Sequence, residues 1–232
     1  MIGYVVTLMN LHASKEIAYR CKESAADVGI RVELFPAVDK NSSLEELANE
    51  GLEIASQEVK DQFLQGADSK YSNQNAVLGN FVSQYRIWNK ILNNNQPGIV
   101  LEHDAVFLAP LPNLEGKGHI INIGIPSFGA FKKQTTPGVY PMFSKPGGYI
   151  PGAHGYYVTP AGAEQLIHAA KTYGAGPCDL FLNNKMFPDI KEIWPQIVEA
   201  RDTFTTIQNQ EGCVAKHSYK KNQKGYAILT NN

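Results

Sequence analysis

The sequence predicts an α/β fold in which a mostly parallel central sheet is covered by helices on both faces. Apolar, β-branched segments of strand length alternate along the 232-residue chain with segments whose apolar residues recur every three or four positions. The first three segments form a β-α-β unit, and the strands of such a unit pair in parallel. We expect one domain over residues 1–215, followed by a basic, partly ordered tail over residues 216–232.

The β-α-β unit occupies the first forty residues. The segment GYVVTLM, residues 3–9, is typical of a strand buried on both faces. Ser14 is placed to cap the helix that follows, and Gly29 to end it. A second strand is expected over residues 32–38. The apolar positions of the helix are Ile17, Cys21, Ala25 and Val28.

A polar segment and the clearest helix of the chain come next. Residues 41–75 are weakly patterned, so we expect a surface excursion rather than core, with a short helix over residues 43–55. A long helix is expected over residues 76–93, and a third strand over residues 98–101. The apolar stripe of that helix consists of Leu78, Phe81, Tyr85, Trp88 and Leu92.

The second half of the domain contains shorter elements. We expect strands over residues 119–125 and 155–159, a helix capped by Thr159, and a short helix after residue 178. Between the two strands, residues 126–151 are rich in Gly, Pro and aromatic residues. Such a long stretch without clear secondary structure is usually functional or mobile.

Charge and cysteine content exclude several classes of protein. The formal net charge of -1 gives no reason to expect nucleic acid or an anionic membrane as a partner. The three cysteines form no even disulfide framework and no CxxC metal spacing. No segment approaches the length of a membrane span, so we expect a soluble, cytoplasmic protein. The sequence leaves the oligomeric state open.

The segment GIVLEHDAVFLA places three polar residues at the end of a buried strand. Alternate residues of an extended chain point the same way, so Glu102 and Asp104 would converge while His103 turns aside. Paired carboxylates attract a cation, and Mg²⁺ or Mn²⁺ often takes one or two carboxylates plus substrate phosphates. A partly exposed strand end with solvated carboxylates is the simpler alternative. A zinc site using His103 and His154 lacks the HExxH spacing.

Several motifs resemble glycosyltransferase family 25, which includes lipooligosaccharide and collagen galactosyltransferases. LGNFVSQYRIWNKILNNNQPGIVLEHDAVF is similar to the central motif of the family, and TLMNL, LFPAVDK, GYYVTPAGAEQLI and PCDLFL are similar to flanking ones. Together they cover roughly residues 3–40 and 76–185, in the order of the family. The chain departs from the pattern at three positions: Asn80 replaces a Cys, Gln84 a His, and His103 the middle Asp.

The resemblance implies a GT-A fold that binds a nucleotide sugar together with Mn²⁺ or Mg²⁺. It assigns the metal first to Asp104 and second to Glu102. His217, in the Lys-rich tail, is a further candidate ligand, although a solvated basic tail is the simpler interpretation. The 126–151 loop is a candidate acceptor rim. Candidates for stacking on sugar faces are Trp194, Tyr140, Tyr149, Tyr156 and Tyr157, for which a place in the core is the simpler interpretation.

The resemblance also implies a donor-binding edge. Its candidates follow the first two strands, lie on the long helix, or surround the acidic pair: Asn10, Leu11, Ala37, Val38, Asp39, Ser83, Gln84, Glu102 and His154. Simpler interpretations exist for three of them: Asp39 as a turn residue, Gln84 as a solvated helix flank, and His154 as a surface-loop histidine.

The reaction implied is inverting transfer of a hexose, such as galactose, from a UDP-sugar to a hydroxyl of a glycan or glycoconjugate. This is a step of the kind used in lipopolysaccharide biosynthesis. Inversion needs a general base, and Asp179 in PCDLFL matches the downstream Asp of the family. The alternative for Asp179 is a helix N-cap. The alternative function is a non-catalytic relative that binds nucleotide or glycan. A nucleotidyltransferase is disfavoured because no Gly-rich loop follows the first strand.

Overall fold

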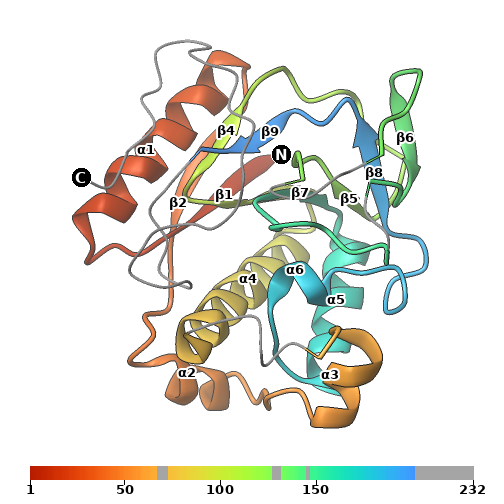
Figure 1. Ribbon diagram of the computed structural model, residues 1–232. Helices are drawn as coiled ribbons and strands as arrows, with labels where there is room; N and C mark the ends of the chain where they lie inside the picture. Colours follow the sequence, from red (N-terminus) through yellow and green to blue (C-terminus); the bar gives the residue numbers. More distant parts are fainter. Residues whose placement is uncertain (67–72, 127–131, 145–146, 202–232) are drawn as a thin grey trace.

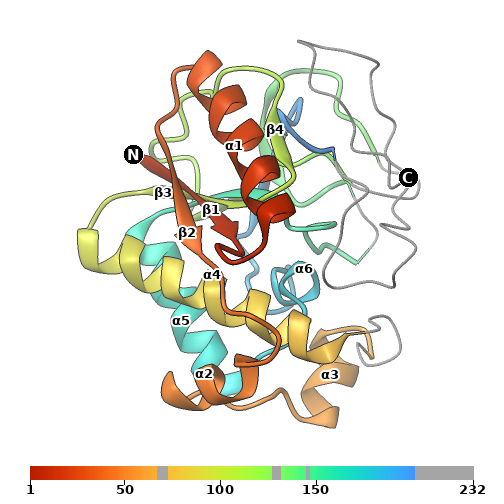
Figure 2. The same ribbon diagram turned by 90° about the vertical axis from the view of Figure 1, so that its left-hand side faces the viewer.

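The chain is organised around a seven-stranded sheet in a computed structural model that describes residues 1–66, 73–126, 132–144 and 147–201. The strand order is β2-β1-β3-β7-β5-β8-β6. Figure 1 shows α1 above this sheet and α4, α5 and α6 below it, and Figure 2 shows the same layers from the side. The predicted α/β class with helices on both faces is therefore confirmed.

The direction of the strands divides the sheet into a parallel and a mixed part. β1 pairs in parallel with both β2 and β3, as the β-α-β unit predicts. β7 runs antiparallel to β3 and β5, β8 runs parallel to β5, and β6 runs antiparallel to β8. The strands are β1 Ile2–Thr7, β2 Val32–Pro36, β3 Gly98–Glu102, β5 Ile120–Asn122, β6 Gly138–Pro141, β7 Gly155–Val158 and β8 Lys191–Trp194. The sheet is thus mixed as a whole, with a continuous parallel part from β2 to β3 and one further parallel pair, β5 with β8.

A second, two-stranded sheet lies on the α1 side. It pairs β4 Ala105–Phe107 with β9 Val198–Ala200. Neither strand was predicted, because three residues are too short to show a period. The helices are α1 His12–Asp27, α2 Ser43–Asn49, α3 Gln57–Phe63, α4 Gln74–Asn94, α5 Pro160–Tyr173 and α6 Cys178–Phe181.

Alternate residues of the central strands supply two separate cores. In β1, Tyr4 and Val6 join the cluster formed with α4 and α5, whereas Val5 joins the cluster formed with α1. In β3, Val100 lies in the first cluster and Ile99 in the second. Successive strand residues point to opposite faces. A strand covered on both faces therefore needs apolar side chains on both, and in β1 and β3 the polar residues Thr7 and Glu102 stand only at the carboxyl ends.

The described residues of the segment 41–75 contribute to the core, which corrects the expectation of a surface excursion. Leu47 and Leu64 are buried, and Ile54 forms a β-bridge with Ala175 at the end of α5. On α4, Arg86 donates to Glu46 and Glu50 at 2.6 Å each, which ties α2 to that helix. Figure 1 shows α2 and α3 closing the lower side of the molecule. The apolar residues here are too sparse to show a period, yet Leu47, Leu52, Ala55 and Leu64 join the core cluster formed with α4 and α5.

Of the two side chains predicted to cap a helix N-terminus, Thr159 and Ser14, one does so and the other does not. The Thr159 side chain accepts a hydrogen bond from the Gly162 N–H, so the predicted cap of α5 is confirmed. The prediction that Ser14 caps α1 is wrong. Leu11 is the N-cap, and the Ser14 hydroxyl inside the first turn accepts from the Leu8 N–H at 3.0 Å.

The predicted tail and part of the predicted 126–151 loop lie outside the described residues. The tail over residues 216–232, with His217, is outside them, and so are residues 127–131 and 145–146 of the expected 126–151 loop. The described part of that loop contains β6, which was not predicted. Within the described residues, no helix is long and apolar enough to cross a membrane.

Candidate functional site

The candidate site lies where β1, β2 and β3 end. These three strands are parallel neighbours, so the residues that follow them meet at one edge of the sheet. Ligands of α/β sheets bind at this edge. Residues 8–11, 37–39 and 102–104 lie there, as predicted from the strand positions.

Three carboxylates gather at this edge. Glu102 ends β3, Asp104 follows it, and Asp179 comes from the first turn of α6. Burial raises the pKa of Glu102 well above its usual range, and the negative charges of Asp104 and Asp179 raise it further. The influence of one charge on another weakens with distance. The fold therefore assembles an acidic cluster from two segments that lie far apart in the sequence.

The chain after Glu102 turns instead of continuing as a strand, which corrects the extended geometry expected for residues 102–104. His103 and Asp104 form the turn, and β4 begins at Ala105. Asp104 is held there by its backbone carbonyl, which accepts from the Arg201 N–H at 3.0 Å. The turn still leaves the Asp104 charge close to Glu102.

His103 points away from the acidic pair, toward α1. Its Nδ1 lies 3.1 Å from the Ser14 hydroxyl, which also accepts from the Leu8 N–H. Burial lowers the pKa of His103 to about 4, so the imidazole is neutral at pH 7. His103 thus links the ends of β1 and β3 to α1, and the prediction that it turns aside is confirmed.

A chain of four hydrogen bonds leads from the core to Glu102. The Trp88 indole N–H donates to the Tyr156 hydroxyl at 2.8 Å, and this hydroxyl donates to Gln84 Oε1 at 2.6 Å. Gln84 Nε2 donates to Asn80 Oδ1 and Asn80 Nδ2 donates to Glu102 Oε1, both at 3.3 Å. We call these bonds the indole-to-carboxylate chain. Gln84 is fully buried, so its interpretation as a solvated flank is wrong.

Sequence reasoning identified Gln84, gave Asn80 and Trp88 no part in the site, and offered Tyr156 only as a residue that stacks on a sugar, not as a hydrogen-bond partner of Gln84. A signal for two of them was present. Asn80, Gln84 and Trp88 are spaced by four residues, which places them in one row along a helix. Tyr156, on β7, carries no such signal because its contact with α4 depends on the tertiary fold.

The end of β2 packs tightly against α4. The Ala37 N–H donates to the Thr7 carbonyl, and the Val38 N–H donates to the Ser83 hydroxyl, both at 2.8 Å. Ser83 is therefore occupied by the backbone rather than turned toward a ligand. Asp39 Oδ1 accepts from the Asn41 N–H at 2.9 Å, the contact expected of a turn residue. At the end of β1, Asn10 and Leu11 are exposed.

His154 and Asp179 are placed differently from their simpler interpretations. The His154 carbonyl accepts from the Glu102 N–H at 3.1 Å, and its imidazole is buried over Gly124, so it is no surface-loop histidine. Pro177, not Asp179, is the N-cap of α6. The pKa of the half-buried Tyr149 is raised by burial and then by the charge of Asp179. The charge of Asp179 therefore acts on both Tyr149 and Glu102.

The donor set at the cluster suits a hard cation that retains other ligands. Within the ranges that the structure describes, no group of three or more His, Cys, Asp and Glu residues could hold a metal ion by itself. Glu102 and Asp104 offer carboxylate oxygens, the atoms that Mg²⁺ and Mn²⁺ prefer. Mg²⁺ is commonly bound by one or two carboxylates plus substrate phosphates and water, so this pair fits the cation as part of a shared site.

No protein-family model matches the chain, and no curated protein matches it either.

Proposed function

We propose that the chain is an inverting, metal-dependent glycosyltransferase with a GT-A fold, similar to glycosyltransferase family 25. It would transfer a hexose, such as galactose, from a UDP-sugar to a hydroxyl of a glycan or glycoconjugate. The observation that carries this proposal is the acidic cluster of Glu102, Asp104 and Asp179 at the carboxyl edge of the parallel strands. A nucleotide-sugar enzyme needs its anionic leaving group neutralised at this edge.

The electrostatics of the cluster favour a bound cation. Three carboxylates in one partly buried place repel one another, as the raised pKa of Glu102 indicates. In the proposal, Asp104 and Glu102 hold Mn²⁺ or Mg²⁺ together with the diphosphate of the donor. When bound, such an ion supplies Lewis-acid neutralisation of the departing nucleoside diphosphate.

The ends of β1 and β2 would receive the nucleoside. The hydrogen bond from Val38 to Ser83 fixes the backbone of residues 37–39, so this edge is preorganised. Asn10 and Leu11 are exposed beside it and available for contact with the donor. Ser83 would act by holding that backbone, and His154 by holding the backbone of Glu102.

Asp179 would act as the general base. The first turn of α6 places its carboxylate near Glu102 and Tyr149. Deprotonation of an acceptor hydroxyl as it attacks the sugar carbon requires a carboxylate that is not already a metal ligand. Glu102 and Asp104 are assigned to the cation, so the remaining member of the cluster takes this part.

A non-catalytic relative that binds nucleotide or glycan is the second candidate. It is favoured by the three departures from the family pattern, at Asn80, Gln84 and His103. Such a protein would bind its ligand without hydrolysing or transferring a sugar. Activity therefore separates the two candidates.

The first experiment is a thermal-shift panel of UDP, GDP, CDP and ADP, each with and without Mn²⁺. We expect stabilisation by UDP only with Mn²⁺, and loss of this effect in Asp104→Ala. The matched control is Asp189→Asn, at an exposed carboxylate outside the cluster. No shift with any nucleotide would contradict the donor site.

The second experiment measures release of UDP from UDP-galactose and other UDP-hexoses. We expect Asp179→Asn to retain the UDP and Mn²⁺ shift while transfer and hydrolysis are lost, because the base acts after the donor has bound. Weakened UDP binding in Asp179→Asn would instead assign Asp179 to the donor. A wild-type protein that binds UDP but never releases it from a UDP-sugar would favour the non-catalytic candidate.

A further inference from the structure

The indole-to-carboxylate chain has a direction that its first member forces. An indole N–H can only donate, so the Tyr156 oxygen accepts from Trp88 and must send its own proton elsewhere. That proton goes to Gln84 Oε1, which turns Gln84 Nε2 toward Asn80. Asn80 then accepts through Oδ1 and donates through Nδ2, so Glu102 meets only an N–H donor.

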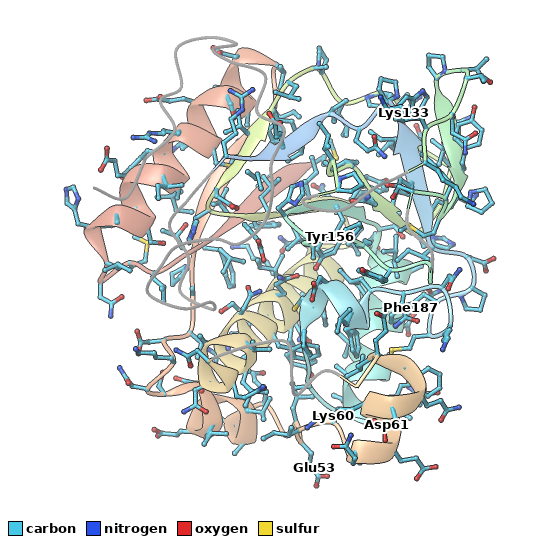
Figure 3. All side chains as sticks on the ribbon, viewed as in Figure 1. Glu53, Lys60, Asp61, Lys133, Tyr156 and Phe187 are labelled. Carbon is cyan, nitrogen blue, oxygen red and sulfur yellow. The ribbon has the colours of Figure 1, made fainter. Side chains whose placement is uncertain are left out.

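The origin of the chain is held rigidly. Trp88, Gln84 and Tyr156 are fully buried. The Trp88 ring stacks on Phe181, with ring centroids 6.0 Å apart, and meets Phe81 edge-on at 5.6 Å. Figure 3 shows Tyr156 near the middle of the molecule, where the sheet faces α4 and α6. Phe181 belongs to α6, which also carries Asp179, so one packed cluster supports both parts of the site.

We propose that Asn80, Gln84 and Tyr156 are positioning residues that hold the Glu102 carboxylate in one orientation, with Oε1 directed to Asn80, so that it is ready to bind a divalent cation. The inference rests on the proposed function, because it assumes that Glu102 is a metal ligand. It goes beyond that function by assigning a role to three residues that do not touch the ion. Outer partners of this kind orient a ligand and thereby raise metal affinity.

The test is a calorimetric titration of Mn²⁺ into the full-length protein in the presence of UDP, with the thermal unfolding of each variant measured in parallel. Asn80→Ala should weaken Mn²⁺ binding by about tenfold, the lower end of the effect of losing an outer partner. Tyr156→Phe should weaken it by about threefold, because members of one hydrogen-bond network are coupled. Tyr156 does not contact Glu102 directly, so a change in this variant reports transmission along the chain.

Matched controls come from the same helix. Tyr85→Phe removes a hydroxyl from another buried tyrosine of the same core, and Asn89→Ala removes an amide that donates to the Tyr85 carbonyl. Both should bind Mn²⁺ as the wild type does. Asn80 is only half-buried, so we expect Asn80→Ala to fold. This variant tests the inference even if Tyr156→Phe unfolds.

The outcomes separate the inference from the function beneath it. If the wild type binds Mn²⁺ with UDP and both chain variants bind equally well, the positioning role is overturned and the metal site stands. If the controls lose as much affinity as the chain variants, the effect is general destabilisation and the inference is likewise overturned. If the wild type binds no Mn²⁺, the metal assignment fails, and the inference fails with it.

Discussion

Replacement of Gly79 by alanine tests the close packing of α4 on the end of β2. A Cβ atom at Gly79 would lie 2.6 Å from the Val38 carbonyl oxygen and 3.5 Å from the Val38 carbonyl carbon. The oxygen contact is far inside the 3.4–4 Å of ordinary van der Waals contact, and it involves backbone that cannot rotate away. The helix and the β2 end must therefore separate by several tenths of an ångström.

The expected energy is a balance of opposing terms. Alanine within a helix is favoured over glycine by about 0.8–1 kcal/mol. Overpacking of a tight contact costs about 1–3 kcal/mol, and weakening the 2.8 Å bond from Val38 to Ser83 costs about 1 kcal/mol more. The clash outweighs the helix propensity, so we expect a net loss of about 1–3 kcal/mol. For a chain of this size that corresponds to a melting temperature lower by about 3–9 °C.

The assay is thermal and urea unfolding of Gly79→Ala beside Asn93→Ala, an exposed position of the same helix. Asn93→Ala should leave the melting temperature unchanged or raise it slightly, because it changes propensity without a clash. UDP affinity of Gly79→Ala should also fall, since residues 37–39 move. A Gly79→Ala protein as stable as the wild type would refute the packing argument.

Two further predictions concern buried ionisable groups. The fold lowers the pKa of His103 to about 4, so the stability gained from its neutral form is complete above pH about 6.5 and is lost as the pH falls toward 4. The loss amounts to about 3 kcal/mol, and the urea midpoint of His103→Asn should fall less than that of the wild type over this range. The raised pKa of Glu102 changes stability with pH in the opposite direction, and it does so in both proteins. The quantity to compare is therefore the difference in urea midpoint between wild type and His103→Asn at each pH. Midpoints that fall in parallel would contradict the prediction for His103. Glu192→Gln should lower the melting temperature by about 4–12 °C. The buried carboxylate accepts hydrogen bonds from both the backbone N–H and the hydroxyl of Ser144. The NH₂ group of a glutamine side chain would face one of these donors and could not accept from it. Glu164→Gln, at an exposed helix position, is its control, and equal losses in the two variants would contradict the prediction.

The elements that were predictable from the sequence are those whose apolar residues recur with the period of a helix or form a continuous strand-length run. The stripe of α4 and the apolar runs of β1 and β3 follow directly from burial on one or two faces. The strands β8 and β9 could not be found in this way, because each includes a buried glutamate, Glu192 or Glu199. The Glu192 carboxylate accepts from Asn122, which only the tertiary fold brings near, and the Glu199 carboxylate accepts from Arg201, two residues further along the chain.

The candidate site was predictable to the extent that it depends on strand ends. Parallel strands place residues 37–39 and 102–104 at one edge, and this follows from the order of the elements alone. The approach of Asp179 to Glu102 depends on how α6 packs against Trp88, which no local pattern specifies. For the same reason Gln84 was predicted at the site, but its buried contact with Tyr156 was not.

The three departures from the family pattern are better explained together than one at a time. An aspartate at position 103 would add a fourth carboxylate beside Glu102, Asp104 and Asp179, whose mutual repulsion already raises the pKa of Glu102. His103 is instead neutral and faces Ser14, so it adds no charge to the cluster. Asn80 and Gln84 complete the row that begins at Trp88 and supply the hydrogen bond that Glu102 accepts. At these three positions the chain therefore limits the charge of the cluster and gives Glu102 a hydrogen-bond donor.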